Sequence, residues 1–516
     1  EISCSLVGSE MCIRDSLYSA LADERIAHRN GGVFYLRIED TDEKRKVDGA
    51  VETIINVLRY FDIEFDEGAG FDDTDPRNAY GPYFQRQRVE IYHTYAKSLV
   101  ERGLAYPCFC TEEELDKVRA KQEEDKVLTG YYGEYATCRN LSYEEVEANI
   151  KAGKPYVLRL RSQGSPDKEI TFVDAIKGEI KLPENIHDIV LLKKDGIPTY
   201  HFAHAIDDHL MRTTTVVRGG EWLASAPIHY ELFHLLGFKM PAYAHTAHLM
   251  KFDEETGGKR KLSKRKDPEL SLDYYRKDGY HPYTMKVYLL TLLNSNFEEW
   301  HEKFPDKDIN EFPFSVEKMN QSGALFDKDK LHNICKNELS KLSEEELYDF
   351  LYDWAKENEP ENVEKWFGDR EKMLQILRLY MGVGAKRRRK DLMYAKQIFE
   401  LISYFFDGES AEEMDEFKLD EDMVSKILKS YLAKYDHNDD NSVWFNKLKE
   451  IADEHGFASD MKAYKANPEN FKGNVSDIAE AVRIAVTGRA NTPDLWTIVH
   501  IMGEEQMTER IKKHIK

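Results

Sequence analysis

The segment KLSKR at residues 261–265 carries the residue types best suited to phosphate chemistry. Lys261 and Lys264 stand three residues apart with the small hydroxyl of Ser263 between them, shortly after a glycine pair. Such a loop could bring compact positive charge onto a polyphosphate, offsetting charge that develops on an α-phosphate and a departing pyrophosphate. A solvated basic turn is the alternative, and these five residues alone favour it. The chain has neither a Walker A loop nor a GxGxxG fingerprint, so ATP would bind by another scheme.

Histidines and aspartates gather in a second segment, which includes His201, His204 and His209 together with Asp207 and Asp208. Their number suggests a metal site, but their spacing matches no standard hydrolytic zinc pattern such as HExxH. A catalytic metal is therefore not expected at this segment.

The cysteines raise a separate metal question. Six cysteines in 516 residues do not form a disulfide scaffold, and they indicate a reducing compartment. Cys108, Cys110 and Cys138 supply a C-x-C pair and one later thiol. Tetrahedral structural zinc requires four good donors, so three thiols leave the set incomplete.

Composition limits the class of protein. The length predicts two to four domains, and 41% apolar with 33% charged residues is typical of a soluble globular chain. No apolar stretch approaches the roughly 20 residues that span a bilayer, and a cytoplasmic location is expected. The net charge of -22 argues by itself against a nucleic-acid partner. Basic clusters at residues 259–266 and 386–390 nevertheless permit RNA binding without demonstrating it.

The first half of the chain mixes strand and helix patterns. Short apolar runs at residues 33–38, 189–192 and 214–217 predict strands, whereas residues 47–60 and 228–236 predict helices. This alternation favours an α/β core with a parallel sheet. Between about residues 106 and 183 a charged stretch rich in Gly and Tyr interrupts the pattern and is interpreted as an insertion.

Beyond about residue 331 the pattern becomes helical. Residues 343–355 and 372–381 have helical periodicity, and Ser343 with Glu346 has the spacing of a capping box. The second half is therefore expected to form one or two all-helical domains.

The ordered motifs together resemble one family. KLSKR is similar to the KMSKS-type loop of class I aminoacyl-tRNA synthetases, in the form that glutamyl enzymes use. Further segments agree in the same order: LRIEDTD (36–42), YPCFCTEEEL (106–115), PTYHFAHAIDDHLM (198–211), VVRGGEWLASAPIH (216–229), SGALFDKDKL (322–331) and TGRANTPDLW (487–496). The similarity extends from about Leu17 to the end of the chain, which is identified as a member of the bacterial-type glutamyl-tRNA synthetase family.

The resemblance implies a Rossmann-like α/β class I catalytic domain with an inserted acceptor-binding α+β domain, followed by an all-α anticodon-binding region. The catalytic domain is expected at residues 17–105 and 184–255, and the insertion at 106–183. The KLSKR loop and stem-contact region should cover 256–330, and the helical anticodon-binding region 331–516. A monomer is the family's usual form.

The implied activity is ATP-dependent ligation of L-glutamate to tRNA(Glu) through glutamyl-adenylate, with Mg²⁺ assisting. Lys264 is expected to make the main transition-state contact. The other residues implied to bind ATP are Lys261, Ser263, Arg265, Met250 and Glu221.

The family match also implies a glutamate pocket. Arg218, at the end of an apolar strand, suits the γ-carboxylate, because a bidentate anion favours arginine over lysine. Glu39 would face the α-ammonium group, and His204 would line the pocket where many relatives carry asparagine. Tyr200 and Trp222 would form its walls, although ordinary core packing is the alternative for these two aromatic residues.

Some relatives hold structural zinc in the insertion. Here Asn140 stands where a histidine ligand would complete one known version, and Tyr132 or Tyr135 is a conceivable fourth ligand beside the three thiols. Buried, reduced cysteines are therefore preferred to a zinc site. In the helical region, Lys386, Arg387, Arg388 and Arg389 are expected to contact tRNA phosphates, with a solvated face as the alternative.

The beginning of the chain departs from the family, which opens with a segment of the type RFAPSPTGxxHxGG that contains the HIGH-class motif. Residues 1–16 read EISCSLVGSEMCIRDS instead. LVGSEMCIRDS resembles a translated sequencing adapter, so this leader is hypothesised to be an artefact. A natural, non-catalytic tRNA-binding paralogue is the alternative. With these residues the chain is expected to be poorly active. A glutaminyl-tRNA synthetase is disfavoured because such enzymes end in β-barrels, and the truncated queuosine-modifying relatives lack the helical half.

Overall fold

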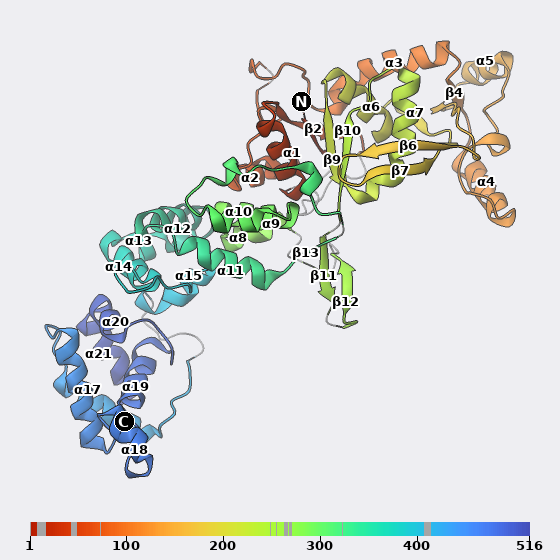
Figure 1. Ribbon diagram of the computed structural model, residues 1–516. Helices are drawn as coiled ribbons and strands as arrows, with labels where there is room; N and C mark the ends of the chain where they lie inside the picture. Colours follow the sequence, from red (N-terminus) through yellow and green to blue (C-terminus); the bar gives the residue numbers. More distant parts are fainter. Residues whose placement is uncertain are drawn as a thin grey trace. The chain divides into compact units, whose positions relative to one another are not determined.

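A computed structural model of the chain contains two compact units (Figure 1). The first unit comprises residues 1–276 and 285–328, and the second comprises residues 277–284 and 329–516. The structure describes residues 2–7, 17–42, 49–72, 74–247, 249–253, 255–262, 267, 271–321, 323–406 and 414–516.

The first unit is built on a seven-stranded sheet with the order β3-β2-β1-β9-β10-β6-β7. The strands are β1 (Ile2–Val7), β2 (Phe34–Glu39), β3 (Glu67–Gly68), β6 (Glu169–Asp174), β7 (Gly178–Pro183), β9 (Thr215–Gly219) and β10 (Ala242–Thr246). All neighbouring strands are parallel except β7, which pairs antiparallel with β6. The predicted α/β core with a parallel sheet is therefore confirmed.

The register of this sheet brings distant residues to one edge. β1 pairs with β2 from Ile2↔Phe34 to Val7↔Glu39, and β9 pairs with β10 so that Arg218 lies opposite His245. Because the carboxyl ends of parallel strands meet at the same edge, Glu39, Arg218 and His245 all lie at the edge where α/β proteins bind ligands.

The first unit also contains helices. They are α1 (Tyr18–Arg29), α2 (Ala50–Tyr60), α3 (Val89–Glu101), α4 (Glu112–Glu124), α5 (Tyr143–Lys151), α6 (Tyr200–Leu210), α7 (Ala226–Leu236) and α10 (Phe297–Lys303). Helix α1 packs against β1, β2 and β9, and helices α3, α6 and α7 share one hydrophobic core. The helices predicted at residues 47–60 and 228–236 correspond to α2 and α7.

One strand prediction requires correction. The apolar run at residues 189–192 was expected in the parallel core, but β8 (Val190–Leu192) belongs to a separate antiparallel sheet with β4 (Ala105–Cys108) and β5 (Val157–Leu160). Leu191 is buried in the same cluster as Leu158 and Leu160, against α3, α6 and α7. A short buried apolar run suits either kind of sheet, so its sequence does not identify the partner strand.

The expected insertion at residues 106–183 contributes to two sheets. Its helices α4 and α5 accompany the β4-β5-β8 sheet, whereas the β6–β7 hairpin extends the central sheet beyond β10. A third sheet, β12-β11-β13, is formed by β11 (Leu249–Asp253), β12 (Gly258–Lys261) and β13 (Ala324–Leu325). The domain boundaries expected from the sequence stay predictions.

The described residues of the second unit form helices joined by loops, with no strand among them. Its helices are α11 (Lys328–Leu339), α12 (Glu344–Asn358), α13 (Val363–Phe367), α14 (Arg370–Met381), α15 (Ala395–Ile402), α16 (Glu421–Lys434), α17 (Asn441–His455), α18 (Met461–Ala466), α19 (Val475–Thr487), α20 (Leu495–Met502) and α21 (Glu504–Lys512). Helices α8 (Leu272–Asp278) and α9 (Pro282–Leu293) cross the boundaries between the units.

The beginning of α12 agrees with the sequence pattern. Ser343 Oγ accepts a hydrogen bond from the backbone N–H of Glu346, and the Glu346 carboxylate accepts one from the backbone N–H of Ser343. This is the predicted capping box. None of the helices in the described part of the chain is long and apolar enough to cross a membrane.

Candidate active site

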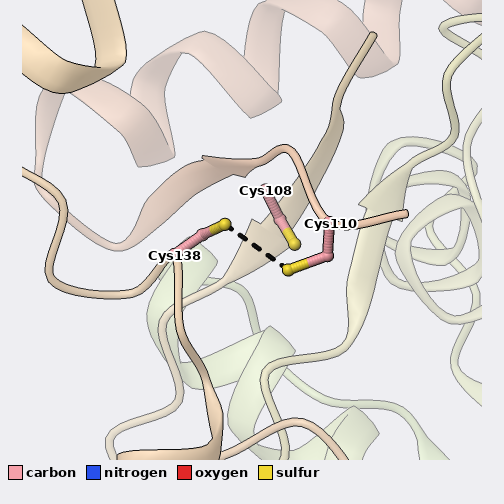
Figure 2. Close-up of side chains that lie close together, drawn as sticks. All are labelled: Cys108, Cys110 and Cys138. Atoms are coloured by element: carbon pink, nitrogen blue, oxygen red, sulfur yellow. Dashed lines mark hydrogen bonds between the residues drawn. The ribbon is translucent and has the colours of Figure 1, made fainter. Parts of the chain in front are cut away.

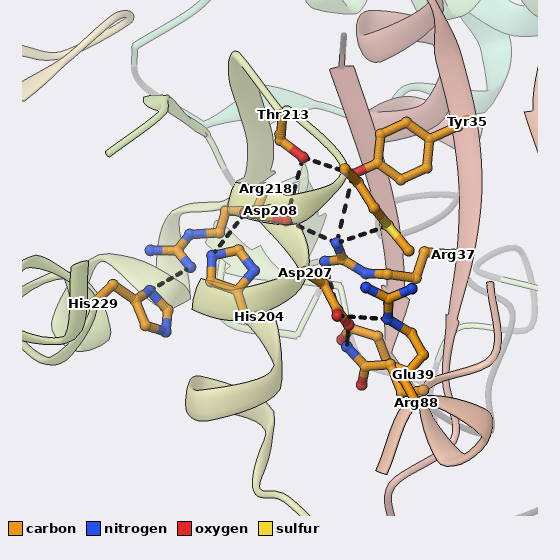
Figure 3. A network of polar contacts seen from close by, with 12 residues as sticks. Tyr35, Arg37, Glu39, Arg88, His204, Asp207, Asp208, Thr213, Arg218 and His229 are labelled. Atoms are coloured by element: carbon orange, nitrogen blue, oxygen red, sulfur yellow. Dashed lines mark hydrogen bonds and ion pairs between the residues drawn. The ribbon is translucent and has the colours of Figure 1, made fainter. Parts of the chain in front are cut away.

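Arg37 lies at the centre of a buried ion-pair network next to the sheet edge (Figure 3). This side chain, on β2, is fully buried and donates from Nη1 to Asp208 Oδ1 at 2.8 Å. Its Nη2 donates to Glu39 Oε1 at 3.4 Å. Burial raises the pKa of Asp208, although the charge of Arg37 opposes the shift. Through this contact Arg37 holds the carboxylate of Glu39, the residue expected to face the α-ammonium group.

Asp207 is the second buried carboxylate of α6. It accepts hydrogen bonds from Arg88 Nε at 2.7 Å, Gln85 Nε2 at 3.0 Å and the Tyr92 hydroxyl at 2.7 Å. These partners come from α3 and the turn before it, so the bonds hold α6 in place beside the sheet. The two aspartates of the segment that suggested a metal are thus partners of Arg37 and Arg88.

Arg218 occupies the end of β9 and is only 8% exposed. Its Nε donates to His245 Nε2 at 2.9 Å, and its Nη1 lies 3.0 Å from His229 Nδ1. The guanidinium carbon also sits 4.5 Å from the centre of the Tyr243 ring, a cation–π distance. Arg218 thus lies at the sheet edge, where the sequence predicted a strand end, and its binding of glutamate stays a prediction. The two histidines around it were not singled out from the sequence as its partners.

Aromatic side chains form a wall beside Arg218. Tyr200, at the start of α6, stacks on His204 with ring centres 5.4 Å apart and approaches Trp222 at 4.7 Å. His204 is fully buried, and its Nε2 lies 2.9 Å from the Tyr243 hydroxyl. Burial raises the pKa of Tyr200 most, and the charges of both Glu39 and Arg218 act on it. Tyr200, His204, Trp222 and Arg218 thus lie close together, and Glu39 lies near enough to act on Tyr200 electrostatically. That these five residues form one glutamate pocket stays a prediction.

The residues expected to bind ATP are only partly placed. Met250 on β11 pairs with Lys261 on β12, and Gly257 adopts a φ of +68° in the turn between these strands. Glu221 is exposed in the short 3-10 helix Gly220–Ser225 that follows β9. Ser263, Lys264 and Arg265 lie outside the described residues, so their assigned roles stay predictions.

Three thiols form a cluster in the insertion (Figure 2). The sulfur atoms of Cys108, Cys110 and Cys138 all lie within 4.8 Å of one another, and those of Cys110 and Cys138 are 3.6 Å apart. Hydrogen bonding from the two neighbouring thiols lowers the pKa of Cys108, which favours a thiolate. The cluster could therefore hold a metal ion.

The nearby tyrosine differs from the two that the sequence suggested. The Tyr131 hydroxyl lies 3.4 Å from Cys108 Sγ and 3.3 Å from Cys110 Sγ. Tyr132 instead donates to the Leu128 carbonyl, and Tyr135 donates to Asp125. In this structure the hydroxyls of Tyr132 and Tyr135 are thus bonded away from the thiols, and Tyr131 is the tyrosine beside them. Both tyrosines belong to a tight turn, and sequence spacing does not show which phenol turns inward.

The basic run of the second unit lies between α14 and α15. Lys386, Arg387 and Arg388 are exposed, and Arg389 pairs with Asp391 at 2.6 Å. Lys390 donates to Asn337 Oδ1 at 2.7 Å. The run is thus positioned at a surface, and its contact with phosphates stays a prediction.

Comparison with known families agrees with this architecture. A family model described as "tRNA synthetases class I (E and Q), catalytic domain" matches residues 16–333, and one described as "Anticodon binding domain" matches residues 347–515. The fold and these two family matches thus define a class I aminoacyl-tRNA synthetase of the E and Q group.

Individual relatives narrow the assignment. The chain is 54% identical over 500 residues to a glutamate–tRNA ligase of Acetivibrio thermocellus, covering 96% of this chain and 90% of the relative. It is 46% identical over 504 residues to a glutamate–tRNA ligase of Clostridium perfringens strain SM101, covering 97% of this chain and 90% of that relative. A crystal structure of a glutamate tRNA ligase from Elizabethkingia meningosepticum in complex with its amino acid has a TM-score of 0.76 at 27% identity, covering 99% of this chain and 98% of that chain. The chain belongs to the glutamate–tRNA ligase family, which confirms the family and fold class expected from the motifs.

Proposed function

We propose that this member of the family ligates L-glutamate to tRNA(Glu) in two steps, with ATP and its bound Mg²⁺ as substrate. The glutamate α-carboxylate attacks the α-phosphate of ATP in line and forms glutamyl-adenylate, releasing pyrophosphate. The 2′-hydroxyl of the terminal adenosine of the tRNA then takes the glutamyl group and releases AMP. Neither step needs a protein nucleophile, because positioning and electrostatic stabilisation supply the catalysis.

The observation that carries this proposal is the buried Arg218 at the carboxyl edge of the sheet, beside Tyr200 and Trp222. A guanidinium there can bind the γ-carboxylate through two hydrogen bonds. Glu39, held by Arg37 at the same edge, supplies the opposite charge for the α-ammonium group. Such a pocket suits an amino acid with an acidic side chain.

Lys264 is proposed to stabilise the transition state of adenylate formation. Replacement of Lys264 with alanine is expected to slow pyrophosphate exchange with ATP, glutamate and tRNA by about 10²–10³-fold, because one oriented charge at the developing anion is lost. Affinity for tRNA should change by less than about twofold, since single phosphate contacts contribute little each. The assay uses a variant in which the family's phosphate-binding segment replaces residues 1–16.

Lys259→Ala is the matched control, because Lys259 is an exposed lysine on β12 just before the loop. The rate of pyrophosphate exchange in this variant should stay within about twofold of the rate in the chain with an unchanged loop. If the Lys264→Ala chain turned over at the normal rate, Lys264 would not have the proposed role.

The chain with residues 1–16 as printed is proposed to be poorly active. Strand β1 lies between β2 and β9 in the central sheet. Residues 1–16 nevertheless contain no histidine and no lysine that could face phosphates. Pyrophosphate exchange should be at least about 100-fold slower than in the variant with the family segment. Equal rates would contradict the proposal, whereas tRNA binding without activity in both chains would favour the paralogue.

The cysteine cluster is proposed to hold structural zinc, with the Tyr131 hydroxyl as its fourth donor. Three thiols within 4.8 Å of one another support this choice over separate reduced cysteines. Elemental analysis should find about one zinc per chain. Cys110→Ser should lose the metal, whereas Tyr131→Phe should weaken zinc binding less, because a phenol is a poorer donor than a thiolate.

Cys335→Ser is the control for the zinc experiment, since Cys335 is a buried thiol of the second unit that contacts Thr284. This variant should retain its metal. A purified native chain without zinc that also fails to take up added zinc would rule the site out.

The helical second unit supports a glutamate rather than a glutamine enzyme, because the described residues of 329–516 form helices and no strand. It is proposed to bind the anticodon region of the tRNA, with Lys386, Arg387, Arg388 and Arg389 on its phosphates. A cytoplasmic location and a monomeric state are proposed with the family assignment.

A further inference from the structure

Arg218 is held by imidazoles rather than by acids. Its Nε donates to His245 on β10, and its Nη1 donates to His229 on α7. Among the described residues, no carboxylate oxygen lies within ion-pair distance of its guanidinium, unlike Arg37 and Arg88 close by. A buried cation without an anionic partner is costly, so its surroundings call for an explanation.

The hydrogen bonds of Arg218 determine where the imidazole protons lie. A guanidinium only donates, so His245 Nε2 and His229 Nδ1 must both be unprotonated. The His245 proton is then on Nδ1, which lies 2.6 Å from Asp174 Oδ2. The His229 proton is on Nε2, which lies 2.9 Å from His201 Nδ1. Both rings are therefore neutral acceptors towards Arg218.

Burial supports the neutral state of these rings. His229 and His245 are fully buried, and burial lowers the pKa of each below its usual value. Burial also lowers the pKa of His201, to about 4. The charge of Arg218 acts in the same direction on all three histidines.

Asp174 is the acidic group at the end of this arrangement. It accepts from the backbone N–H and Nδ1 of His245 and from the backbone N–H groups of Ile176 and Lys177. The His245 ring separates Asp174 from Arg218, so the carboxylate orients the ring without pairing with the guanidinium. The position of Arg218 is thus fixed while its charge is left to a ligand.

We propose that His229 and His245 are positioning residues that hold Arg218 through neutral acceptors, so that no protein carboxylate competes with the substrate's γ-carboxylate, and that they thereby set the preference for L-glutamate over L-glutamine. The inference rests on the proposed function, in which Arg218 binds that carboxylate. A γ-carboxylate supplies the charge that the buried guanidinium lacks, whereas a γ-amide cannot. An acidic side chain in place of either histidine would neutralise Arg218 and remove the distinction.

The test is a calorimetric titration of the full chain with L-glutamate and with L-glutamine, in the presence of tRNA(Glu). His229→Gln keeps an acceptor for Arg218 and a donor for His201, whereas His229→Glu places a carboxylate on Arg218. Glutamate affinity should stay within about fivefold in His229→Gln and fall about 100-fold in His229→Glu, with glutamine affinity changing much less. His209→Gln is the matched control, because His209 is exposed on α6 and should leave both affinities unchanged.

The outcomes separate the inference from the proposed function. If the unchanged chain binds no glutamate, the proposed pocket itself fails. If it binds glutamate and His229→Glu keeps both affinity and preference, only the inference fails. Should His229→Glu not fold in a thermal melt, His245→Gln and His245→Leu decide instead. His245→Gln should keep glutamate affinity within about fivefold of the unchanged chain, whereas His245→Leu should lower it at least about tenfold. Equal glutamate affinities in these two variants would overturn the inference.

Discussion

Replacing Arg218 with lysine is expected to weaken L-glutamate binding by about 100-fold, and replacing it with leucine by about 1,000-fold. The guanidinium uses Nε for His245 and Nη1 for His229, and Nη2 makes only a long contact of 3.5 Å with the Trp222 carbonyl. Its planar fork can therefore still present two donors to a carboxylate. A lysine ammonium is a single point charge that cannot make all of these bonds together. The Tyr243 ring below the guanidinium also favours a planar cation. Calorimetric titration, or the dependence of pyrophosphate exchange on glutamate concentration, measures the effect.

Arg212→Lys is the matched control for this experiment. Arg212 follows α6 in the same unit and is exposed, with its guanidinium 5.7 Å from the centre of the Tyr80 ring. The same exchange of arginine for lysine should therefore change glutamate affinity by less than about twofold. If Arg218→Lys binds glutamate as well as this control does, Arg218 does not bind the γ-carboxylate.

Much of the architecture follows from local patterns in the sequence. The apolar run at residues 33–38 and the run at 214–217 became β2 and β9, because each is buried and bounded by turn residues. The capping pair Ser343 and Glu346 fixed the start of α12 by local hydrogen bonds. Arg218 could be singled out because a charge at the end of an apolar strand requires a partner.

The remaining features depend on contacts between distant segments. His229 and His245 meet Arg218 only after α7 and β10 pack beside β9, and Asp174 joins them from β6. Tyr131 reaches the thiols because of how its turn folds, and β8 pairs with β5 because of burial against three helices. Such contacts have no fixed spacing in the sequence. The sequence offered one clue to the partners of Arg218, because His229 belongs to the same motif, residues 216–229.

Replacing Arg37 with methionine is expected to destabilise the first unit by about 3–5 kcal/mol, because it leaves Asp208 and Glu39 buried without their common cation. Arg37 and Asp208 are both 0% exposed at the side chain, so water cannot take over the lost contacts. Hydrogen exchange of β2 and α6 during urea unfolding measures the change for this unit alone.

Arg77→Met is the control, since Arg77 pairs with Asp75 at the surface and its loss should leave the stability of the unit nearly unchanged. Adding Asp208→Leu to Arg37→Met should recover part of the loss, because it removes one of the two stranded charges. If Arg37→Met costs no more than the surface control, the network does not hold Glu39 in place, and the α-ammonium group must be bound by other means.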